Sequence, residues 1–582
     1  MQNRTQRNGL FFALPTQATT NAAFPRILSW MERLMPFDRY AVRLAHGKAQ
    51  FNDEYVNLPS ASGICEDSSE DGAIVNSWFE GGKKALLADY VVGTIDQLLL
   101  MALKQKHVML RHFGLADKVV VIDECHAFDS YMGQYLYMAL RWLGAYKTPV
   151  IIMSATLPPQ KRREMIAAYM GKSTASNLPL SDANAYPLIT CVCDEQIQQY
   201  AVECKDDQKI ISIEALTDEN IATYLDTKLT QGGCVGVIVN TVKKAQQLYL
   251  QLADKYGADV VRLAHSRFLI GDRVSNEREL IRELGKESEH RPQLRIVVGT
   301  QVLEQSLDVD FDLMISELCP MDLLLQRIGR LHRHNRSRPA QLDKPICAVL
   351  CLDETNKGSA SIYGDCLLMR TKALLPNRIV LPTDIPKLVA KTYDFAFEPE
   401  GLPEEYAHAL DKHNTNERIR QRKASSFRLA KPSIWATRTL NDWFNIDVPY
   451  SEQRSYAAVR DGDESVEVVV LIRHEQGLGF LPWCEGGQIP EAFDELPPQV
   501  AKAMARQTIA LPTPLCKAHS VENTLKELES LKDEIPKAWK KSTWLTDQLF
   551  LVLDEELKTT LNGYCITYDR LIGMTYMKED SQ

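Results

Sequence analysis

Two carboxylates directly follow an apolar run in the segment KVVVIDECHAFDSYM, residues 118–132. Asp123 and Glu124 come straight after the apolar residues 119–122. A buried strand gains nothing by ending on two acids, whereas nucleotide hydrolysis uses such a pair: the first acid holds magnesium and the second orients or deprotonates a water. The alternative is a strand that reaches the surface and ends in solvated acids. The segment by itself leaves both interpretations open.

A neighbouring segment, VIIMSAT at residues 150–156, also ends in small polar side chains, Ser154 and Thr156. In open α/β sheets, ligands bind at the carboxyl ends of the parallel strands. Hydroxyl groups at an adjacent strand end are placed to hydrogen-bond the acid pair and to link the state of a nucleotide to a domain closure. We therefore predict that these two strand ends form one site.

Cationic side chains recur in the segment QRIGRLHRH, residues 326–334. Gln326, Arg330 and Arg333 stand at positions i, i+4 and i+7, which predicts one shared face of a helix. Arginines brought by a second domain neutralise the charge that develops in phosphoryl transfer. The alternative is an ordinary basic surface helix. Gly329 and Gln326 within that face favour the functional interpretation.

Composition places these segments in a large acidic protein. The chain has 582 residues, a net charge of −9, 45% hydrophobic residues and 25% charged residues. This length exceeds what one core supports and predicts several domains. The negative charge does not exclude a nucleic-acid partner, because net charge describes solubility more than sites. Basic residues gather locally at 327–338 and 418–431, although a solvated surface also produces such runs.

Targeting and metal-binding signals are weak. The sequence contains no apolar run approaching the ~18 residues of a membrane helix, and its first residues do not have the form of a signal peptide. The 13 cysteines are scattered and lack zinc-ligand spacing. We therefore expect no membrane association, and a cytoplasmic protein with reduced thiols.

Short, β-branched apolar segments alternate with helical patterns along the first 355 residues or so, which predicts α/β domains with parallel sheets covered on both faces. The segments between 157 and 233 lack this rhythm, so we expect two such domains, with boundaries at 1–180 and 181–355. Residues 356–440 read as mainly helical and basic, and 441–582 as a smaller α+β part containing a hairpin at 459–483. The expected strands are 10–16, 42–47, 90–96, 119–124, 150–156, 235–241, 260–265, 295–301, 313–318 and 347–352.

Taken in order, these segments resemble the motifs of superfamily 2 helicases. LPTQATTN resembles motif Ia, GTIDQLL the next DNA-contacting motif, DECH the DExH box and SAT motif III, while VVGTQVLEQSLDVD resembles motif V and QRIGRLHRH motif VI. The closer resemblance is to the CRISPR-associated helicase-nuclease of type I systems, the enzyme recruited by the Cascade complex. It extends over roughly residues 10–350. It implies two tandem RecA-like domains, the first incomplete at its N-terminus, followed by a helical linker and a C-terminal accessory domain.

The resemblance also implies roles for individual residues. Asp123 would hold Mg²⁺ and Glu124 would activate the attacking water, while Arg330 and Arg333 would reach the γ-phosphate of ATP with Gln326 nearby. Asp308 would lie where the nucleotide and DNA sites meet. Ser154 and Thr156 would couple ATP hydrolysis to the contacts with the DNA strand. His126 would couple the two sites, or serve only as a structural imidazole. The implied contacts to single-stranded DNA are Thr16, Gln17, Thr94, Asp96, Thr241 and Thr300.

The phosphate-cradling loop G-x-x-x-x-G-K-[ST] does not occur ahead of the motif Ia segment. The GKS at 171–173 follows a helix-like segment and has Ile166 where the first glycine should stand. The family's HD nuclease would also lie upstream, and the chain contains no His-Asp dipeptide. We therefore expect the C-terminal part of a larger enzyme, inactive as an ATPase by itself, with an upstream chain or segment supplying the nuclease and the loop.

Three functions follow from these patterns. The first is an ATP- and Mg²⁺-dependent translocase or helicase on single-stranded DNA, which unwinds target DNA for degradation. The second is an inactive remnant that binds single-stranded DNA or a Cascade-type surveillance complex. The third is a general DExH RNA helicase. The segments ALPTQATTNA and CPMDLLLQRIGRLHRH disfavour it, because they resemble the CRISPR-associated family.

Overall fold

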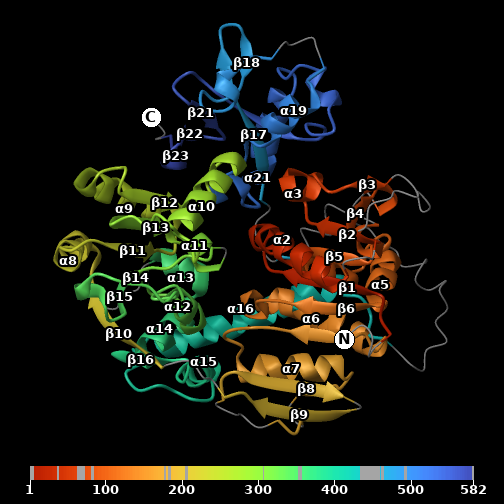
Figure 1. Cartoon of the computed structure of the whole chain (residues 1–582), viewed down its shortest axis with the longest axis vertical. Coiled ribbons are helices and arrows are strands. Elements are labelled where there is room, and N and C mark those ends of the chain that lie inside the picture. The colour runs from red at the N-terminus through yellow and green to blue at the C-terminus, as the bar shows by residue number, and fades with distance from the viewer. Residues whose placement is uncertain are drawn as a thin grey trace. The chain divides into compact units, whose positions relative to one another are not determined.

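The chain forms two compact units in a computed structural model (Figure 1). The first unit comprises Met1–Ile210, Pro320–Gln326 and Tyr363–Asp461, and the second comprises Ile211–Cys319, Arg327–Ile362 and Gly462–Gln582. The structure describes residues 6–35, 39–61, 72–79, 84–175, 178–180, 185–193, 195–203, 208–305, 307–350, 357–432, 459–460, 465–490 and 495–579. None of the helices in these ranges is both long and apolar enough to cross a membrane.

The first unit is built on a seven-stranded sheet in the order β3-β4-β2-β5-β1-β6-β7, in which every pairing is parallel. Alternate side chains of its central strands enter two separate cores, since Val91 packs on one face and Val92 on the other. This confirms the prediction of a parallel sheet covered on both faces. The strands are β1 Gly9–Leu14, β2 Arg39–Ala45, β3 Ser60–Ala61, β4 Gly72–Asn76, β5 Tyr90–Thr94, β6 Lys118–Ile122 and β7 Val150–Ile152.

Helices cover this sheet. The helix after the acid pair, α6, begins at the cap Asp129, whose carboxylate accepts a hydrogen bond from the Met132 backbone N–H at 2.8 Å. It packs so closely on α7 that a side chain at Gly144 would lie 1.9 Å from the carbonyl oxygen of Tyr169. The elements are α2 Gln17–Leu34, α3 Asp53–Val56, α4 Ile95–Leu99, α5 Val108–Ala116, α6 Ser130–Ala145 and α7 Pro159–Tyr169, with the antiparallel hairpin β8 Leu188–Cys193 and β9 Gln196–Ala201.

The linker region is mainly helical, as predicted. Arg370 is fully buried and holds this region together by donating to the backbone carbonyls of Thr392 and Asp394 and to the Tyr406 hydroxyl. The long helix α16 ends beside the first sheet's helices, where the Lys104 N–H donates to the Phe427 carbonyl at 3.0 Å. The elements are α13 Lys357–Tyr363, α14 Asp365–Leu374, β16 Arg378–Leu381, α15 Ile385–Tyr393 and α16 Tyr406–Phe427.

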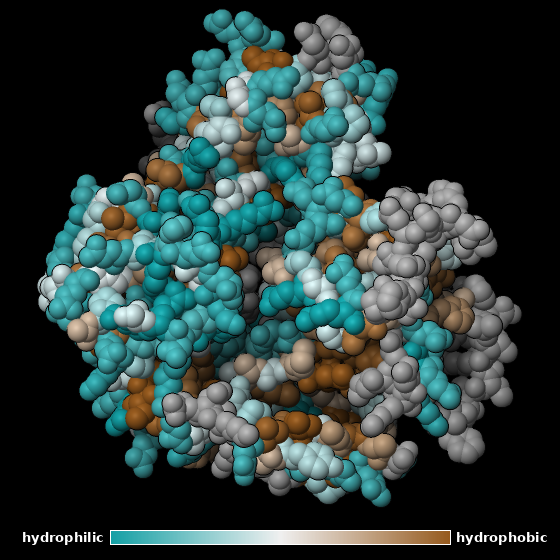
Figure 2. All heavy atoms as spheres, viewed as in Figure 1, coloured by the Kyte–Doolittle hydropathy of each residue, from teal (hydrophilic) through white to brown (hydrophobic). Residues whose placement is uncertain are grey.

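The second unit contains a second parallel sheet, whose strands run in the order β12-β13-β11-β14-β15-β10. The strand at 209–216 was not predicted, because its side chains alternate between exposed and buried instead of forming a continuous apolar run. The strands are β10 Lys209–Leu216, β11 Gly233–Ile238, β12 Val261–Ala264, β13 Leu294–Gly299, β14 Leu313–Glu317 and β15 Ile346–Leu350, and the helices are α8 Ile221–Lys228, α9 Val242–Tyr256, α10 Ile270–Leu284 and α11 Gln301–Gln305. Helix α12, Met321–Ile328, belongs to the first unit up to Gln326 and to the second from Arg327. Figure 2 shows mainly hydrophilic side chains over α8 and α9.

The C-terminal part of the second unit is an α+β arrangement, and the predicted hairpin is present as β17 and β18. It is tied to the second sheet's helices: the Tyr568 hydroxyl donates to Asp272 at 2.6 Å, and the Gln246 amide donates to the carbonyls of Ile572 and Met574 at 3.0 Å. Its elements are β17 Glu467–His474, β18 Gly477–Gly479, α19 Pro498–Ala505, β19 Thr508–Ala510, α20 Thr513–Cys516, α21 Val521–Leu531, β20 Leu549–Leu553, β21 Lys558–Leu561, β22 Tyr564–Asp569 and β23 Gly573–Lys578.

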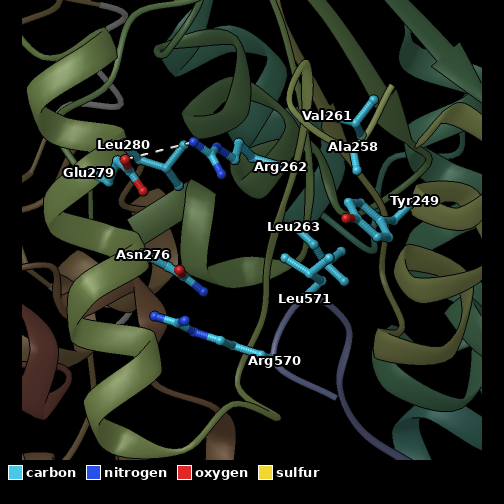
Figure 3. A pocket seen from close by; sticks show the side chains of 10 residues that line it. All are labelled: Tyr249, Ala258, Val261, Arg262, Leu263, Asn276, Glu279, Leu280, Arg570 and Leu571. Atoms are coloured by element: carbon cyan, nitrogen blue, oxygen red, sulfur yellow. Dashed lines mark ion pairs between the residues drawn. The ribbon is translucent and has the colours of Figure 1, made fainter. Parts of the chain in front are cut away.

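Figure 3 shows a cavity within this unit, between α9, α10 and the turn that joins β22 to β23. Arg262 and Glu279 face each other across it at 3.7 Å, and Arg570 and Leu571 reach it from the turn. Its volume of about 40 Å³ leaves room for about one water molecule. It is therefore a packing gap and not a ligand site.

Candidate active site

The predicted acid pair lies at the carboxyl end of β6, in the interior of the first sheet. The Asp123 N–H donates to the Ala13 carbonyl of β1 at 2.9 Å, and the Asp123 carboxylate accepts from the Glu124 N–H at 3.0 Å. Glu124 has a left-handed backbone with φ of 53°, an unusual conformation for a residue with a side chain. The chain thus turns sharply as it leaves the strand, and both acids stay half-buried.

Asp123 has the environment of a cation ligand. Burial raises the pKa of Asp123 above its usual value, while the Glu124 N–H and the charge of Arg26 act in the opposite direction. Among the residues that the structure describes, no cationic group lies within ion-pair distance of this carboxylate. A half-buried carboxylate without a counter-ion fits a hard divalent cation such as Mg²⁺, which binds proteins through one or two carboxylates.

His126 joins the acid pair to the neighbouring strand end. Its Nδ1 lies 2.9 Å from Ser154 Oγ and 3.2 Å from Glu124 Oε2. Burial lowers the pKa of His126 to about 4, against a smaller opposing effect of Gln326. The imidazole is therefore neutral at pH 7, and its contact with Glu124 is not an ion pair.

Gln326 extends this set of contacts within the first unit. Its amide donates to Thr156 Oγ1 at 3.1 Å, and Gln326 also hydrogen-bonds His126. The structure therefore brings together five of the residues singled out from the sequence, and their roles in catalysis remain predictions. The connected residues are Glu124, His126, Ser154, Thr156 and Gln326.

The expectation of one helical face for Gln326, Arg330 and Arg333 is wrong. Helix α12 ends at Ile328, because the following residues pair with the backbone of Phe311 instead of continuing the helix. The Phe311 N–H donates to the Arg330 carbonyl, and the His332 N–H donates to the Phe311 carbonyl, both at 2.9 Å. Arg330 and Arg333 thus belong to a loop.

Contacts with the motif V segment fix both arginine side chains of this loop. Arg330 donates to the Glu304 carbonyl oxygen at 2.8 and 3.3 Å, and Arg333 donates to the Asp308 carboxylate at 2.6 Å. Partial burial opposes ionisation of Asp308, but Arg333 outweighs it and holds the pKa of Asp308 below its usual value. Asp308, predicted at a nucleotide–DNA junction, therefore pairs with the predicted phosphate-binding Arg333.

A buried ion pair that the sequence did not indicate underlies this loop. Arg327 and Glu304 are both fully buried, and Arg327 Nε donates to the Glu304 carboxylate at 2.8 Å. Arg327 also donates to Asn240 Oδ1 at 2.9 Å and to Ser316 Oγ at 3.1 Å. Since the Glu304 carbonyl binds Arg330 and the Glu304 carboxylate binds Arg327, one residue positions both arginines.

A second ionic cluster holds the remainder of the loop, and it too was missed. Asp310 and Asp312 are almost completely buried. Arg338 contacts both carboxylates, and Arg336 binds Asp310 at 2.8 Å. The run of acids in DVDFD was a visible signal, but burial of its last two acids has no marker in the sequence.

The predicted DNA contacts fall at strand ends in both units. In the first unit Thr16 caps α2, and its hydroxyl accepts from the Thr19 N–H at 3.2 Å, while Gln17 is the first residue of that helix. Thr94 lies at the end of β5, directly opposite Leu14 of β1 in the sheet register, and is buried. Asp96 follows in α4 and binds Arg460.

In the second unit Thr241 caps α9 and accepts from the Lys244 N–H at 3.3 Å. Thr300 is buried after β13, and its N–H donates to the Ala264 carbonyl at 3.1 Å. The sheet register aligns β11 with β13, so these two residues share an edge. Among the described residues, no group of three or more metal-ligating side chains occurs.

Comparison with known families matches three parts of the chain. Residues 64–165 match the DEAD/DEAH box helicase family, residues 231–336 match the C-terminal part of the CRISPR-associated nuclease/helicase Cas3, and residues 460–574 match the Cas3 C-terminal domain. The helicase match includes the acid pair, and the second match includes motifs V and VI as far as Arg336.

Individual relatives match over nearly the whole chain. The CRISPR-associated nuclease/helicase Cas3 of Streptococcus thermophilus is 42% identical, over 98% of this chain and 64% of that protein. The crystal structure of T. fusca Cas3-ADP is 27% identical, with a TM-score of 0.82 over 99% of this chain and 65% of that one. A chain of a CRISPR RNA-guided surveillance complex, pre-nicking, is 25% identical, with a TM-score of 0.68 over 98% of this chain and 68% of that one. The present chain thus spans about two thirds of the length of the first two relatives.

Proposed function

Since the chain belongs to the Cas3 family of CRISPR-associated helicases, and its fold is that of tandem RecA-like domains with a C-terminal domain, we propose that it is the single-stranded DNA translocase portion of a type I CRISPR interference enzyme. The observation that carries this proposal is the acid pair at the end of β6, joined through His126 and Gln326 to Thr156. An acid that holds Mg²⁺ and a neighbouring group that orients the attacking water are two of the parts used in nucleotide hydrolysis. The chain would act in the cytoplasm.

Each residue has a defined part in this proposal. Asp123 would hold Mg²⁺, which neutralises charge on the phosphates of ATP. Glu124 orients the attacking water, and the neutral imidazole of His126 holds Glu124 in place through its contact at 3.2 Å. Arg330 and Arg333 stabilise the charge that develops on the transferred phosphoryl group. Their contacts with Glu304 and Asp308 keep both guanidinium groups ordered before ATP arrives.

The partners follow from the relatives. The structures described as Cas3-ADP and as a pre-nicking surveillance complex support ATP as the substrate and a Cascade-type complex as the partner of this chain. A segment bearing G-x-x-x-x-G-K-[ST] is needed to hold the phosphates. We propose that an upstream segment or companion chain supplies this loop together with the nuclease.

A binding experiment separates this function from a general RNA helicase. We expect the purified chain to bind a fluorescent oligo-dT in an anisotropy titration, with an affinity that falls linearly in log–log form as salt rises. Phosphate contacts that read no bases give this behaviour. An RNA oligomer of the same length should compete poorly, because its 2′-hydroxyl groups, and not its phosphates, distinguish it from DNA on such a surface. Equal or better competition by RNA would contradict the proposal, and so would the absence of DNA binding.

A further inference from the structure

Arg460 lies next to two of the predicted DNA contacts, although it is far from them in sequence. Its Nε donates to Asp96 Oδ1 at 3.1 Å and its Nη2 to Asp96 Oδ2 at 2.9 Å. Nη2 also donates to the Pro15 carbonyl at 3.3 Å. The preceding residue, Val459, is fully buried in the core of the first sheet. The guanidinium is thus held by a two-point fork and one backbone carbonyl.

The two partners of Arg460 lie in the segments that follow two strand ends and that carry the predicted contacts to DNA. Pro15 follows β1 and precedes Thr16, whereas Asp96 lies two residues after Thr94 at the end of β5. Strands β1 and β5 are neighbours, with Leu14 opposite Thr94. Arg460 therefore spans both segments at the edge where phosphates would lie.

Charge explains why an arginine belongs here. A lone carboxylate at Asp96 would repel the DNA backbone, and the paired guanidinium cancels that charge. The N–H groups on Nη1 have no acceptor among the described residues, and 53% of the Arg460 side chain is exposed. Because half of the Arg460 side chain lies in solvent while that of Asp96 is 19% exposed, the ion pair is screened and contributes only modestly to stability.

We propose that Arg460 is a phosphate-binding residue of the single-stranded DNA surface, oriented by Asp96 and by the Pro15 carbonyl. The proposal rests on the proposed DNA-translocase function. Arg460 is the first residue of the region that matches the Cas3 C-terminal domain. It would thus add a DNA contact beside the predicted contacts at the ends of β1 and β5. Arginine suits this task, because one edge of its planar fork can bind a carboxylate while the other binds a phosphate.

The test is the salt dependence of oligo-dT binding by the full chain and its variants, measured by anisotropy between about 0.05 and 0.2 M NaCl. We expect Arg460→Gln to make the negative slope of log K against log salt shallower by about 0.7, the value for one phosphate contact on single strands. Arg460→Lys should keep the wild-type slope, because the charge remains. The matched control is Arg473→Gln, which removes an arginine that is 56% exposed and paired with Glu534, and its slope should equal that of wild type.

Each outcome decides the question. An Arg460→Gln slope equal to wild type overturns the inference while leaving the proposed function standing. The proposal is also overturned if the slope for Arg460→Lys becomes as shallow as that for Arg460→Gln. Arg460 would then serve only to bind Asp96. Absence of salt-dependent binding by the wild-type chain would overturn both proposals. Thermal unfolding midpoints equal to wild type should show that all three variants fold.

Discussion

The acidic residues at the end of β6 and those of the motif V segment are held in opposite ways. Asp123 has no cationic group at ion-pair distance among the described residues, and burial raises its pKa. The acids at the end of motif V and just after it are compensated: Asp308 pairs with Arg333, while Asp310 and Asp312 both pair with Arg338. Uncompensated charge marks the place where a ligand supplies the missing cation. Compensated charge marks a set of contacts that orients the arginines proposed to bind phosphate before a ligand is present.

Removing the buried ion pair of Arg327 and Glu304 should have the largest effect on the free energy of unfolding. Arg327→Ala removes the cationic partner of the buried Glu304 carboxylate, and we expect a loss of about 3–5 kcal/mol in the free energy of unfolding. Urea denaturation of the full chain measures it. Arg282→Ala, at an exposed arginine paired with Glu279, is the control and should change stability by less than about 0.5 kcal/mol. A loss in Arg327→Ala no larger than in this control would show that the pair is not the support of the loop.

A double replacement sharpens the same point. Arg327→Met with Glu304→Leu removes both charges and fills the space with apolar groups, so most of the lost stability should return. The stability should not return fully, because the Asn240 and Ser316 contacts of Arg327 are gone as well. Double replacement as unstable as Arg327→Ala would mean that packing, and not charge, dominates there.

Buried neutral histidines should make the first unit sensitive to acid. The Tyr146 hydroxyl lies 2.8 Å from His112 Nδ1, and the Met101 carbonyl lies 2.9 Å from Nε2. Burial lowers the pKa of His112 to about 4 from 6.5, so the unfolded chain takes up the proton first as pH falls. Stability from this group is complete above pH 6.5 and is lost toward pH 4.

The expected size of this loss is about 2 kcal/mol between pH 7 and pH 5. Urea midpoints at both pH values, in wild type and in His112→Gln, isolate it from the titration of other groups. The variant should lose less stability on acidification, although it is less stable at pH 7. His408→Gln, at an exposed histidine of α16, serves as control. Equal pH dependence in wild type and His112→Gln would contradict the assignment.

The smallest effect should have the opposite sign. Asp123→Asn removes a half-buried charge that has no cation beside it, so the free energy of unfolding should rise by less than about 1 kcal/mol, since solvent still screens this carboxylate. The comparison variant Asp308→Asn should instead lose up to about 1 kcal/mol, because it breaks an exposed ion pair. Chemical denaturation without Mg²⁺ measures both. A clear loss of stability in Asp123→Asn would show that Asp123 has a structural role.

Much of the fold followed from local patterns in the sequence. Continuous apolar runs, β-branched in β5, β6 and β11, predicted these three strands and β1. The polar residues after such runs placed Asp123 and Ser154 at one sheet edge. The patterns could not show where tertiary contacts outweigh the local preference for a helix. The spacing of Gln326, Arg330 and Arg333 fits a helix, yet pairing with Phe311 ends α12 at Ile328.

Contacts between distant segments were equally invisible. Asp96 and Arg460 are 364 residues apart, and no local signal relates an acid in one helix to an arginine that far along the chain. Burial of charge has the same character. Arg327 and Arg330 are three positions apart in one motif, but only Arg327 is fully buried.

The most direct test of the central claim is ATP hydrolysis measured with and without a loop-bearing segment. The chain would be mixed with the N-terminal part of its Streptococcus thermophilus relative, which is 42% identical over the shared region. We predict Mg²⁺-dependent hydrolysis stimulated by single-stranded DNA for the mixture, none for the chain alone, and loss of activity in Glu124→Gln. Hydrolysis by the chain alone, or undiminished activity in Glu124→Gln, would contradict the account.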